Sequence, residues 1–136
     1  MATKTPRGIR NNNPLNIRIG NAWRGEVANP TDPSFEQFKT MQYGLRAGFV
    51  LLRRYINHYH RTKVPEIIKA WAPAHENNTN AYIKSVLAHT GLNCASVISF
   101  NDMRIMCLLV QAMCKVECDV IIPLETIEQG YDLATT

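Results

Sequence analysis

The stretch that most constrains the fold lies near the C-terminal end of the chain, from Ser99 to Asp119. Apart from Arg104, Gln111 and Lys115, which fall on one narrow stripe at helical spacing, residues 103–116 are apolar. This pattern predicts a helix that is buried on most sides and forms the centre of a small domain. Just before this helix, Ser99 is followed three residues later by an aspartate, which is the spacing of a capping box.

Glu117 stands at the C-terminal end of this predicted helix, on the same side as Met106, Val110 and Met113. The helix would aim the carboxylate at the core, where desolvation and the negative end of the helix dipole both raise its pKa. A carboxyl group with a raised pKa can serve as a general acid. The alternative is that Glu117 only marks the helix end and points to water, because buried unpaired carboxylates are rare.

Length and charge limit the remaining possibilities. The 136 residues predict one domain, with a polar arm and β-hairpin region over 1–39 and a helical part over 40–136. No apolar run approaches the roughly 20 residues that cross a bilayer, and no secretory signal precedes the domain, so we expect cytoplasmic synthesis and no integral membrane segment. The net charge of +4 favours an anionic partner, such as nucleic acid, an acidic membrane surface or an anionic cell-wall polymer.

Hydrophobic periodicity predicts a mainly α fold with a small β element. Short β-type runs interrupted by glycine, asparagine and proline predict a hairpin or a three-stranded sheet over residues 19–38. Besides the central helix, we expect helices over residues 40–60, 64–72, 78–89 and 124–134.

The cysteines indicate neither a zinc site nor a disulfide framework. Cys94, Cys107, Cys114 and Cys118 lack CxxC spacing and a matching histidine pattern. Buried free thiols are therefore expected, with a disulfide that involves Cys94 as the alternative. No metal and no cofactor are expected.

Two groups of polar residues could carry chemistry. Glu26, beside Trp23, is the best candidate for the second carboxylate that a glycosidase would use, and its alternative role is that of a solvated turn residue. Glu76, Thr79 and Tyr82 share one face at a helix start and could line a cleft, although the same residues suit helix capping.

Several segments together resemble phage and prophage lysozyme-like proteins, which lyse the bacterial cell wall. In chain order they are RGIRNNNPLNIR, WRG, FEQFKTMQYGLRAGFVLLRRY, WAP, ENNTNAYIKSV, AMCKVECD and ETIEQGYDLA. The resemblance covers nearly all of the chain and implies an α+β lysozyme-like fold. It also implies a circular permutation, because the helix that ends in the catalytic glutamate comes first in the usual order and near the C-terminus here. Such permutation is plausible where domain termini lie close together.

The resemblance implies roles for individual residues. Glu117 corresponds to the catalytic acid and base. Thr79 and Tyr82 are similar to the Glu-Thr-x-x-Tyr-Val motif of lytic transglycosylases, whose tyrosine lies in the catalytic pocket. Asn16, Ile17 and Arg18 occupy the place where those enzymes line the cleft after the catalytic helix. Independently of the resemblance, the position of Trp71 in a short amphipathic helix predicts a core residue, with stacking on a sugar ring as the alternative.

The sequence departs from the pattern of that family in two segments. Leu15 replaces a glycine and crowds a backbone position near the substrate, and Cys118-Asp119 replaces Asn-Gly after Glu117. The second change removes a left-handed C-cap residue and adds a negative charge. Either change favours altered substrate positioning, or a descendant that binds the wall without cutting it.

The leading hypothesis is a phage-encoded glycosidase that cleaves peptidoglycan between N-acetylmuramic acid and N-acetylglucosamine, by lytic transglycosylation rather than hydrolysis. It would act on peptidoglycan glycan strands, either released at lysis or carried in the virion, with no nucleic acid as partner and an oligomeric state left open. The alternative is a non-catalytic phage virion structural or wall-binding protein, and a weaker one is nucleic-acid binding. Glu117 is the expected catalytic residue, and the expected substrate-binding residues are Asn16, Arg18, Glu26, Glu76, Thr79 and Tyr82.

Overall fold

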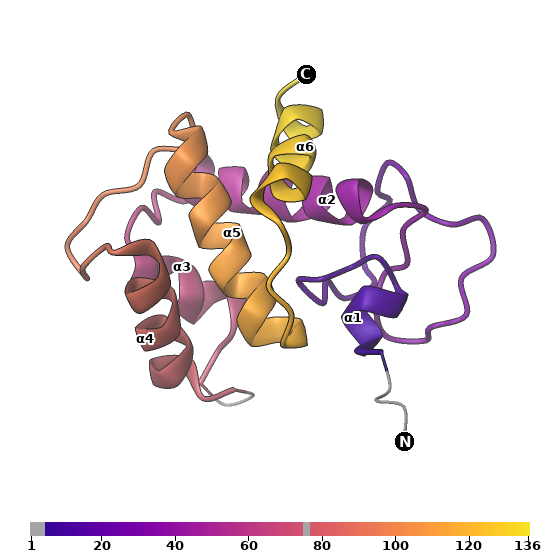
Figure 1. Ribbon diagram of the computed structural model, residues 1–136, viewed down its shortest axis with the longest axis horizontal. Helices are drawn as coiled ribbons and strands as arrows, with labels where there is room; N and C mark the ends of the chain where they lie inside the picture. The colour runs from indigo at the N-terminus through magenta and orange to yellow at the C-terminus, as the bar shows by residue number, and fades with distance from the viewer. Residues whose placement is uncertain (1–4, 75–76) are drawn as a thin grey trace.

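The fold is a small helical assembly preceded by an irregular N-terminal arm, as the computed structural model shows for residues 5–74 and 77–136. In Figure 1, α5 runs through the middle of the molecule, α4 and α3 lie on one side, and the arm lies on the other. The mainly α prediction is confirmed. The helices are α1 (Arg7–Arg10), α2 (Met41–Arg53), the π-helical turn η1 (Arg54–His58), α3 (Val64–Trp71), α4 (Thr79–Thr90), α5 (Met103–Cys118) and α6 (Leu124–Thr135).

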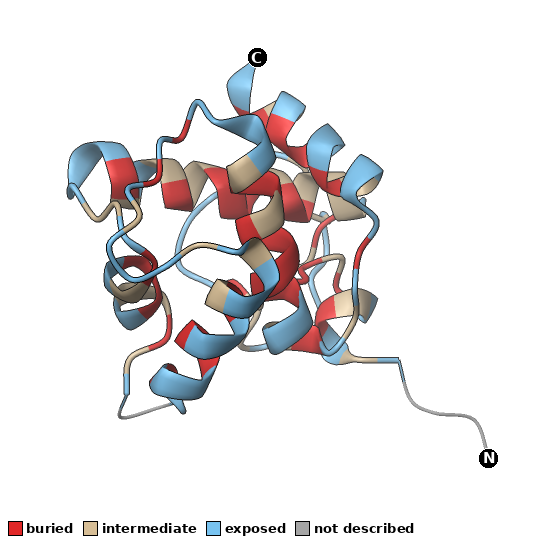
Figure 2. Cartoon of the chain, turned by 60° about the vertical axis from the view of Figure 1, so that its left-hand side comes forward, coloured by how far each residue is buried: buried red, intermediate tan, exposed pale blue. Residues whose placement is uncertain are grey.

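The central helix α5 has the buried character that its sequence predicts. Figure 2 shows buried residues along most of its length and on the faces that its neighbours turn toward it. Met106, Leu109, Val110 and Met113 are inaccessible to solvent. Burial of such side chains stabilises the fold by about 1.5–3 kcal/mol each.

Two details of α5 differ from the prediction. Gln111 is buried rather than part of a solvated stripe, because its amide donates to the Ile122 carbonyl at 2.8 Å and its Oε1 lies 2.7 Å from His89 Nε2. The capping box is also wrong. Asp102 alone caps the helix by accepting from the Ile105 N–H, while the Ser99 hydroxyl oxygen accepts from the Asn101 N–H outside the helix.

Helix α2 begins at a local capping signal, but its C-terminal end differs from the prediction. Thr40 caps it by accepting from the Tyr43 N–H at 3.3 Å. At its other end the helix changes into η1, where the sequence predicts a regular helix to residue 60.

Gly44 lies where the arm crosses α2, and a Cβ there would meet the Asn12 carbonyl oxygen at 1.8 Å. Only glycine permits this approach of the two backbones.

The predicted β-hairpin is wrong. Within the described residues of the arm, pairing is limited to two isolated bridges, Arg18 with Phe35 and Glu26 with Phe38. The Asp32 side chain forms the turn instead, accepting from the N–H groups of Ser34 and Phe35 at 2.9 and 3.0 Å. Prolines on both sides of this aspartate supply no N–H for a strand ladder.

The arm and the helices share one hydrophobic core. Leu15, Ile17 and Phe38 of the arm join the buried side chains of α2, α3, α5 and α6 in a continuous cluster. The arm is therefore fixed against the helices by packing, although it has almost no regular secondary structure.

The remaining expectations concern helix ends, thiols and membrane segments. Helix α4 begins after Asn78, whose side chain accepts from the Ala81 N–H, and ends at Gly91 with φ of +75°. All four cysteines are free thiols; Cys94 is exposed and the other three are buried. Among the described residues, no helix is both long enough and apolar enough to cross a membrane.

Candidate functional site

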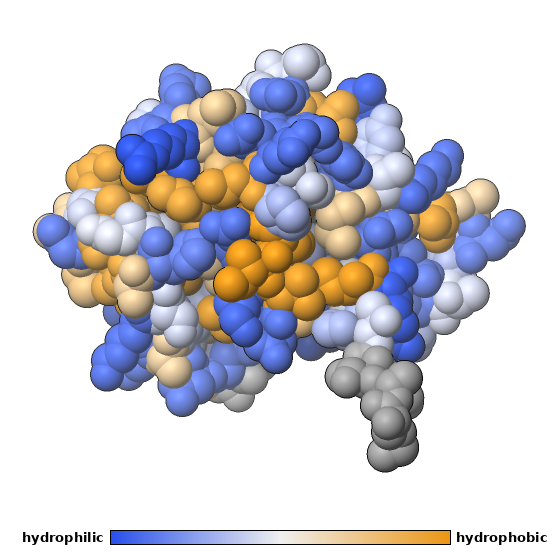
Figure 3. Space-filling model, viewed as in Figure 1, coloured by the Kyte–Doolittle hydropathy of each residue, from blue (hydrophilic) through white to orange (hydrophobic). Residues whose placement is uncertain are grey.

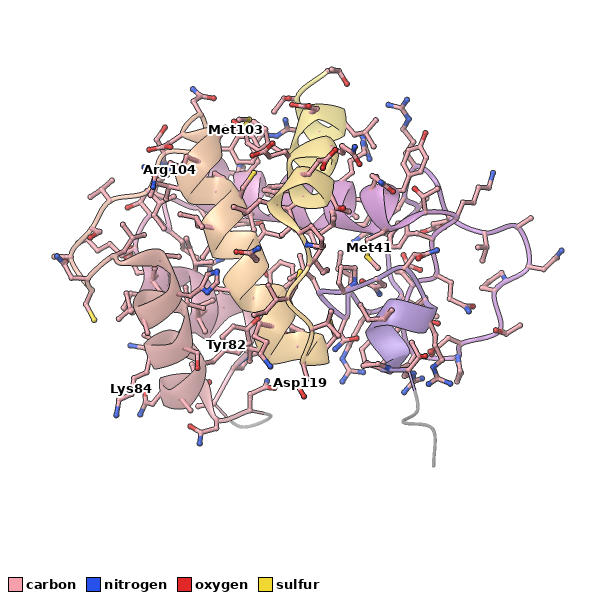
Figure 4. The ribbon with its side chains drawn as sticks, viewed as in Figure 1. Met41, Tyr82, Lys84, Met103, Arg104 and Asp119 are labelled. Carbon is pink, nitrogen blue, oxygen red and sulfur yellow. The ribbon has the colours of Figure 1, made fainter. Side chains whose placement is uncertain are left out.

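Glu117 meets two other parts of the chain at the C-terminal end of α5. The Tyr82 hydroxyl, from α4, donates to Glu117 Oε2 at 3.0 Å. The Asn16 side-chain amide, from the arm, donates to Glu117 Oε1 at 3.3 Å and to the Glu117 main-chain carbonyl at 3.0 Å. In Figure 4, Tyr82 points from α4 toward the end of α5 where Asp119 is labelled. The structure thus brings together Glu117, Tyr82 and Asn16, which the sequence singles out.

The surroundings of Glu117 act on its pKa in opposite directions. Burial raises the pKa of the Glu117 carboxyl, and the polar groups of Tyr82, Asn16 and Trp71 oppose that shift. Burial and the neighbouring carboxylate raise the pKa of the Tyr82 phenol. The phenol therefore stays protonated and can donate to Glu117.

Asn16 reaches Glu117 because the backbone of the arm is held in an unusual conformation. Its φ is +52°, in the left-handed region that asparagine tolerates better than most residues. The neighbours Leu15 and Ile17 are both buried and anchor the arm on either side. The Leu15 side chain thus enters the core, and it also forms part of the wall beside Glu117.

Asp119 takes the place of the C-cap glycine that the resemblance implies. It adopts the left-handed conformation with φ of +58°, and its N–H donates to the Lys115 carbonyl at 3.0 Å. Its carboxylate forms an ion pair with Lys115 at the surface, and this pairing lowers the pKa of Asp119. The left-handed cap is therefore kept, contrary to the prediction that the substitution removes it.

A hollow of about 410 Å³ opens beside Glu117, and we call it the Glu117 hollow. Its wall combines aromatic side chains with amides, a guanidinium and one carboxylate. Tyr55 and Trp71 meet edge to face with ring centroids 6.0 Å apart, and the Arg18 guanidinium lies 4.9 Å from the Phe35 ring centre. The lining residues are Leu15, Asn16, Ile17, Arg18, Asn21, Phe35, Leu51, Tyr55, Trp71, Ala72, Asn77 and Glu117. Such a lining suits a ligand with both apolar faces and hydroxyl groups.

The Glu117 hollow is one of four that share lining residues in series. The arginine hollow shares Asn21 and Leu51 with it, and is also lined by Ala22, Trp23, Val50, Arg53, Arg54, Asn57 and His58. On the other side, the Tyr82 hollow shares Asn77 and Glu117 with it, and is also lined by Asn78, Ala81, Tyr82, Ser85 and Val116. The last, the Lys115 hollow, shares Ser85 and Val116 with the Tyr82 hollow, and is also lined by His89, Ala112 and Lys115. We call this series of adjoining hollows the groove, and Glu117 lines its two middle members.

Only some of the other predicted site residues lie at the hollows. Arg18 lines the Glu117 hollow. Thr79 is buried, and its hydroxyl donates to the Ala72 carbonyl at 2.5 Å, so it joins α4 to the end of α3. Glu26 lines none of the four hollows, and its carboxylate accepts from the Trp23 N–H at 3.0 Å. Glu76 lies outside the described residues.

Glu26 instead lies beside a second carboxylate, Glu36. The pKa of Glu36 is raised to about 7. Burial is the larger cause, and the neighbouring Glu26 carboxylate adds to it. One oxygen of the Glu36 carboxylate has no hydrogen-bond partner in the described part of the chain. This pair lies in the arm and takes no part in the groove.

Sequence reasoning named Trp71 only as an alternative site residue and missed Tyr55 in the aromatic wall of the Glu117 hollow. Trp71 is half-buried and faces the hollow, although it was expected to be core, and Tyr55 belongs to the apolar face of a predicted helix. The signal for Trp71 was its place at a helix end before Ala-Pro. No signal marked Tyr55, because its orientation depends on the π-helical turn. No group of three or more metal-ligating side chains occurs among the described residues.

Comparison with known proteins gives one informative match. No protein-family model matches the chain. Protein P5 of Pseudoalteromonas phage PM2 is 47% identical over 90 residues, which are 63% of this chain and 56% of that protein. The chain therefore spans little more than half the length of the curated relative that it matches.

These findings overturn the assignment to the lysozyme-like lytic family. The resemblance predicted similarity to wall-lytic enzymes, whereas no family model matches and the relative found is a phage protein named only P5. The prediction of peptidoglycan-cleaving activity was inferred from that assignment and is therefore wrong as well. The prediction that the chain is an enzyme stays a prediction.

Proposed function

We propose that this chain is a non-catalytic phage protein, carried in the virion, that binds the glycan strands of the bacterial cell wall in the groove around Glu117. Similarity to a protein of phage PM2 supports the phage origin. The groove carries the rest of the proposal, because a linear polymer needs contacts on both sides of a central position.

The lining of the Glu117 hollow supports a saccharide as the ligand. Sugars present apolar C–H faces and a rim of hydroxyl groups. Trp71 and Tyr55 offer aromatic surface for the faces, while Asn16, Asn77 and Glu117 offer donors and acceptors for the hydroxyls. In this proposal Glu117 is the buried acceptor at the centre of the groove.

The lining of the Glu117 hollow argues against hydrolysis by a pair of carboxylates. A glycosidase of the two-carboxylate type places its acidic groups on opposite sides of the scissile bond. Among the described residues that line the Glu117 hollow, Glu117 is the single carboxylate. Both of its oxygens already accept hydrogen bonds, from Asn16 and Tyr82.

The proposal extends to the fold, which we infer to be a degenerate, circularly permuted lysozyme-like fold. In the usual order the segment with the Asn-Ile-Arg motif follows the glutamate-bearing helix. Here the two are 101 residues apart in sequence, yet Asn16 donates to the last turn of α5. The two segments therefore touch in space here, whereas in the usual order they are neighbours in sequence. This contact supports the permutation.

Co-sedimentation with insoluble peptidoglycan sacculi tests the proposed function. The wild type should pellet with the sacculi and leave the turbidity of the suspension constant. Glu117→Gln should bind about tenfold more weakly, because a hydrogen bond to a charged acceptor contributes roughly 1.5–3 kcal/mol. Glu128→Gln is the matched control, since Glu128 is exposed on α6 and lines none of the four hollows.

Two outcomes would contradict the proposal. Equal binding by the wild type and Glu117→Gln would remove the groove as the glycan site. Clearing of the suspension by the wild type but not by Glu117→Gln would show that the chain cleaves the wall.

A further inference from the structure

The arginine hollow differs in chemistry from the part of the groove beside Glu117. It has a volume of about 580 Å³ and is lined by two arginines, a histidine, two asparagines and a tryptophan. Its described lining residues include no carboxylate. Arg54 and His58 are exposed at its wall, so a ligand can reach them.

Positive charge also accumulates behind this wall. Arg46 lies near Arg24 and Arg53, and its burial together with these like charges lowers the pKa of its guanidinium. Arg53, which lines the hollow, is held in place by donating to the Ala134 carbonyl at 2.8 Å. Fixed cations at the wall of a concave site concentrate anions there.

The π-helical turn η1 aims its residues at two neighbouring hollows. Arg54, Asn57 and His58 line the arginine hollow, and Tyr55 lines the Glu117 hollow. A π-helical turn is uncommon and occurs frequently at functional sites. Here it places a cationic group and an aromatic ring side by side along one groove.

We infer that the arginine hollow binds a phosphate group carried by a saccharide polymer while the sugar chain occupies the Glu117 hollow. Arg54 and His58 would contact the phosphate oxygens, because guanidinium groups form paired, charge-assisted hydrogen bonds with phosphate. The asparagine amides at Asn21 and Asn57 would donate to the same group or to the adjoining sugar. This inference rests on the proposed function, since it names the kind of glycan that the groove prefers.

Two preparations of sacculi test the inference. The first carries a phosphodiester-linked polymer, and the second is the same material after hydrofluoric acid has removed that polymer. The wild type should bind the phosphate-bearing sacculi about tenfold more tightly than the stripped sacculi. Arg54→Gln should bind both preparations with the affinity that the wild type has for the stripped one. His58→Gln should show a smaller loss in the same direction.

Lipopolysaccharide micelles, with and without enzymatic dephosphorylation, form a second arm that separates the two sources of such phosphates. Binding that depends on both phosphate and Arg54, to either the sacculi or the micelles, supports the inference. The preparation that shows it identifies the source of the phosphate. Arg104→Gln is the matched control, because Arg104 is exposed on α5 and lines none of the hollows; Figure 4 shows it near the opposite end of that helix from Asp119.

The failure of this inference is distinct from failure of the proposed function. If the wild type binds stripped sacculi but gains nothing from phosphate in either arm, the arginine hollow is not a phosphate site and the glycan groove stands. If the wild type fails to bind stripped sacculi, the proposed function itself fails. Tighter binding to a random DNA duplex than to any saccharide, lost in Arg54→Gln, would overturn the inference in favour of nucleic acid.

Discussion

Glu117 owes its properties to three segments that the fold brings together at one helix end. Desolvation disfavours its charged form, while the Tyr82 hydroxyl and the Asn16 amide favour it. A buried carboxylate costs stability, and such groups are typical of functional sites.

Removal of the Tyr82 hydroxyl should raise the pKa of Glu117 further. In Tyr82→Phe the carboxylate loses a donor that stabilises its charged form, and the burial remains. An NMR titration of the Glu117 side-chain carboxyl carbon measures this shift. Tyr59→Phe is the control, because Tyr59 is exposed and lines none of the hollows. An unchanged or lowered pKa in Tyr82→Phe would contradict the observed hydrogen bond.

Glu36 should make the stability of the fold depend on pH in a defined window. Its pKa is raised from 4.5 to about 7 in the folded state, so the folded state holds its proton more tightly than the unfolded state does. The resulting stability is fully present below about pH 4.5 and is lost as the pH rises to about 7. The loss is roughly 3 kcal/mol at most.

Glu36→Gln should remove this part of the pH dependence and be the more stable protein at pH 8. Urea unfolding at several pH values measures the effect, with Glu128→Gln as the exposed control. Parallel stability curves for Glu36→Gln and the wild type would rule out a raised pKa for Glu36.

At the scale of elements, the helices were predictable and the arm was not. Helical periodicity and local end signals, such as Thr40 and Gly91, determine α2 and α4 from a short stretch of sequence. The arm depends on side-chain contacts between distant residues. One example is the Asn13 amide, which donates to the Glu36 carbonyl at 3.0 Å. No local pattern encodes such contacts, which is why the hairpin prediction was wrong.

The crossing of the arm over α2 should be sensitive to a single methyl group. Gly44→Ala places a Cβ against the Asn12 carbonyl, so the arm must move or α2 must bend. We expect a loss of about 1–3 kcal/mol in the free energy of unfolding, together with weaker sacculus binding because Asn16 moves with the arm. Gly20→Ala is the matched control, since a Cβ there would meet no atom within 4 Å. Equal stability of the two variants would show that the arm is not packed as observed.

At the scale of the whole molecule, the groove is a product of tertiary structure. The sequence marked Glu117, Asn16, Arg18 and Tyr82 as site residues, and the structure brings these to neighbouring hollows. The sequence could not predict the groove itself, because the wall of the Glu117 hollow comes from the arm, α2, η1, α3 and α5. Apolar residues such as Trp71 line the Glu117 hollow. Such residues at helical spacing usually belong to a core, so the pattern alone does not distinguish the two roles.

The face of the molecule in Figure 3 carries a further apolar area. Hydrophobic residues form a band over α5 and the segment that leads to α6, where Val116, Ile121 and Leu124 are exposed. Val116 also belongs to the groove, at the wall of the Tyr82 and Lys115 hollows. The groove therefore borders apolar surface at one end and arginine-rich surface at the other, and under the proposed function this difference would orient a bound polymer.

The affinity for a soluble peptidoglycan oligosaccharide, followed by NMR chemical-shift changes, tests the central claim most directly. The wild type should show its largest shifts at residues of the Glu117 hollow, and Trp71→Ala should bind at least about tenfold more weakly because it loses a stacking surface. Tyr59→Ala should bind as the wild type does. Equal affinities of the wild type and Trp71→Ala, or shifts confined to residues outside the groove, would contradict the claim that this groove binds glycan.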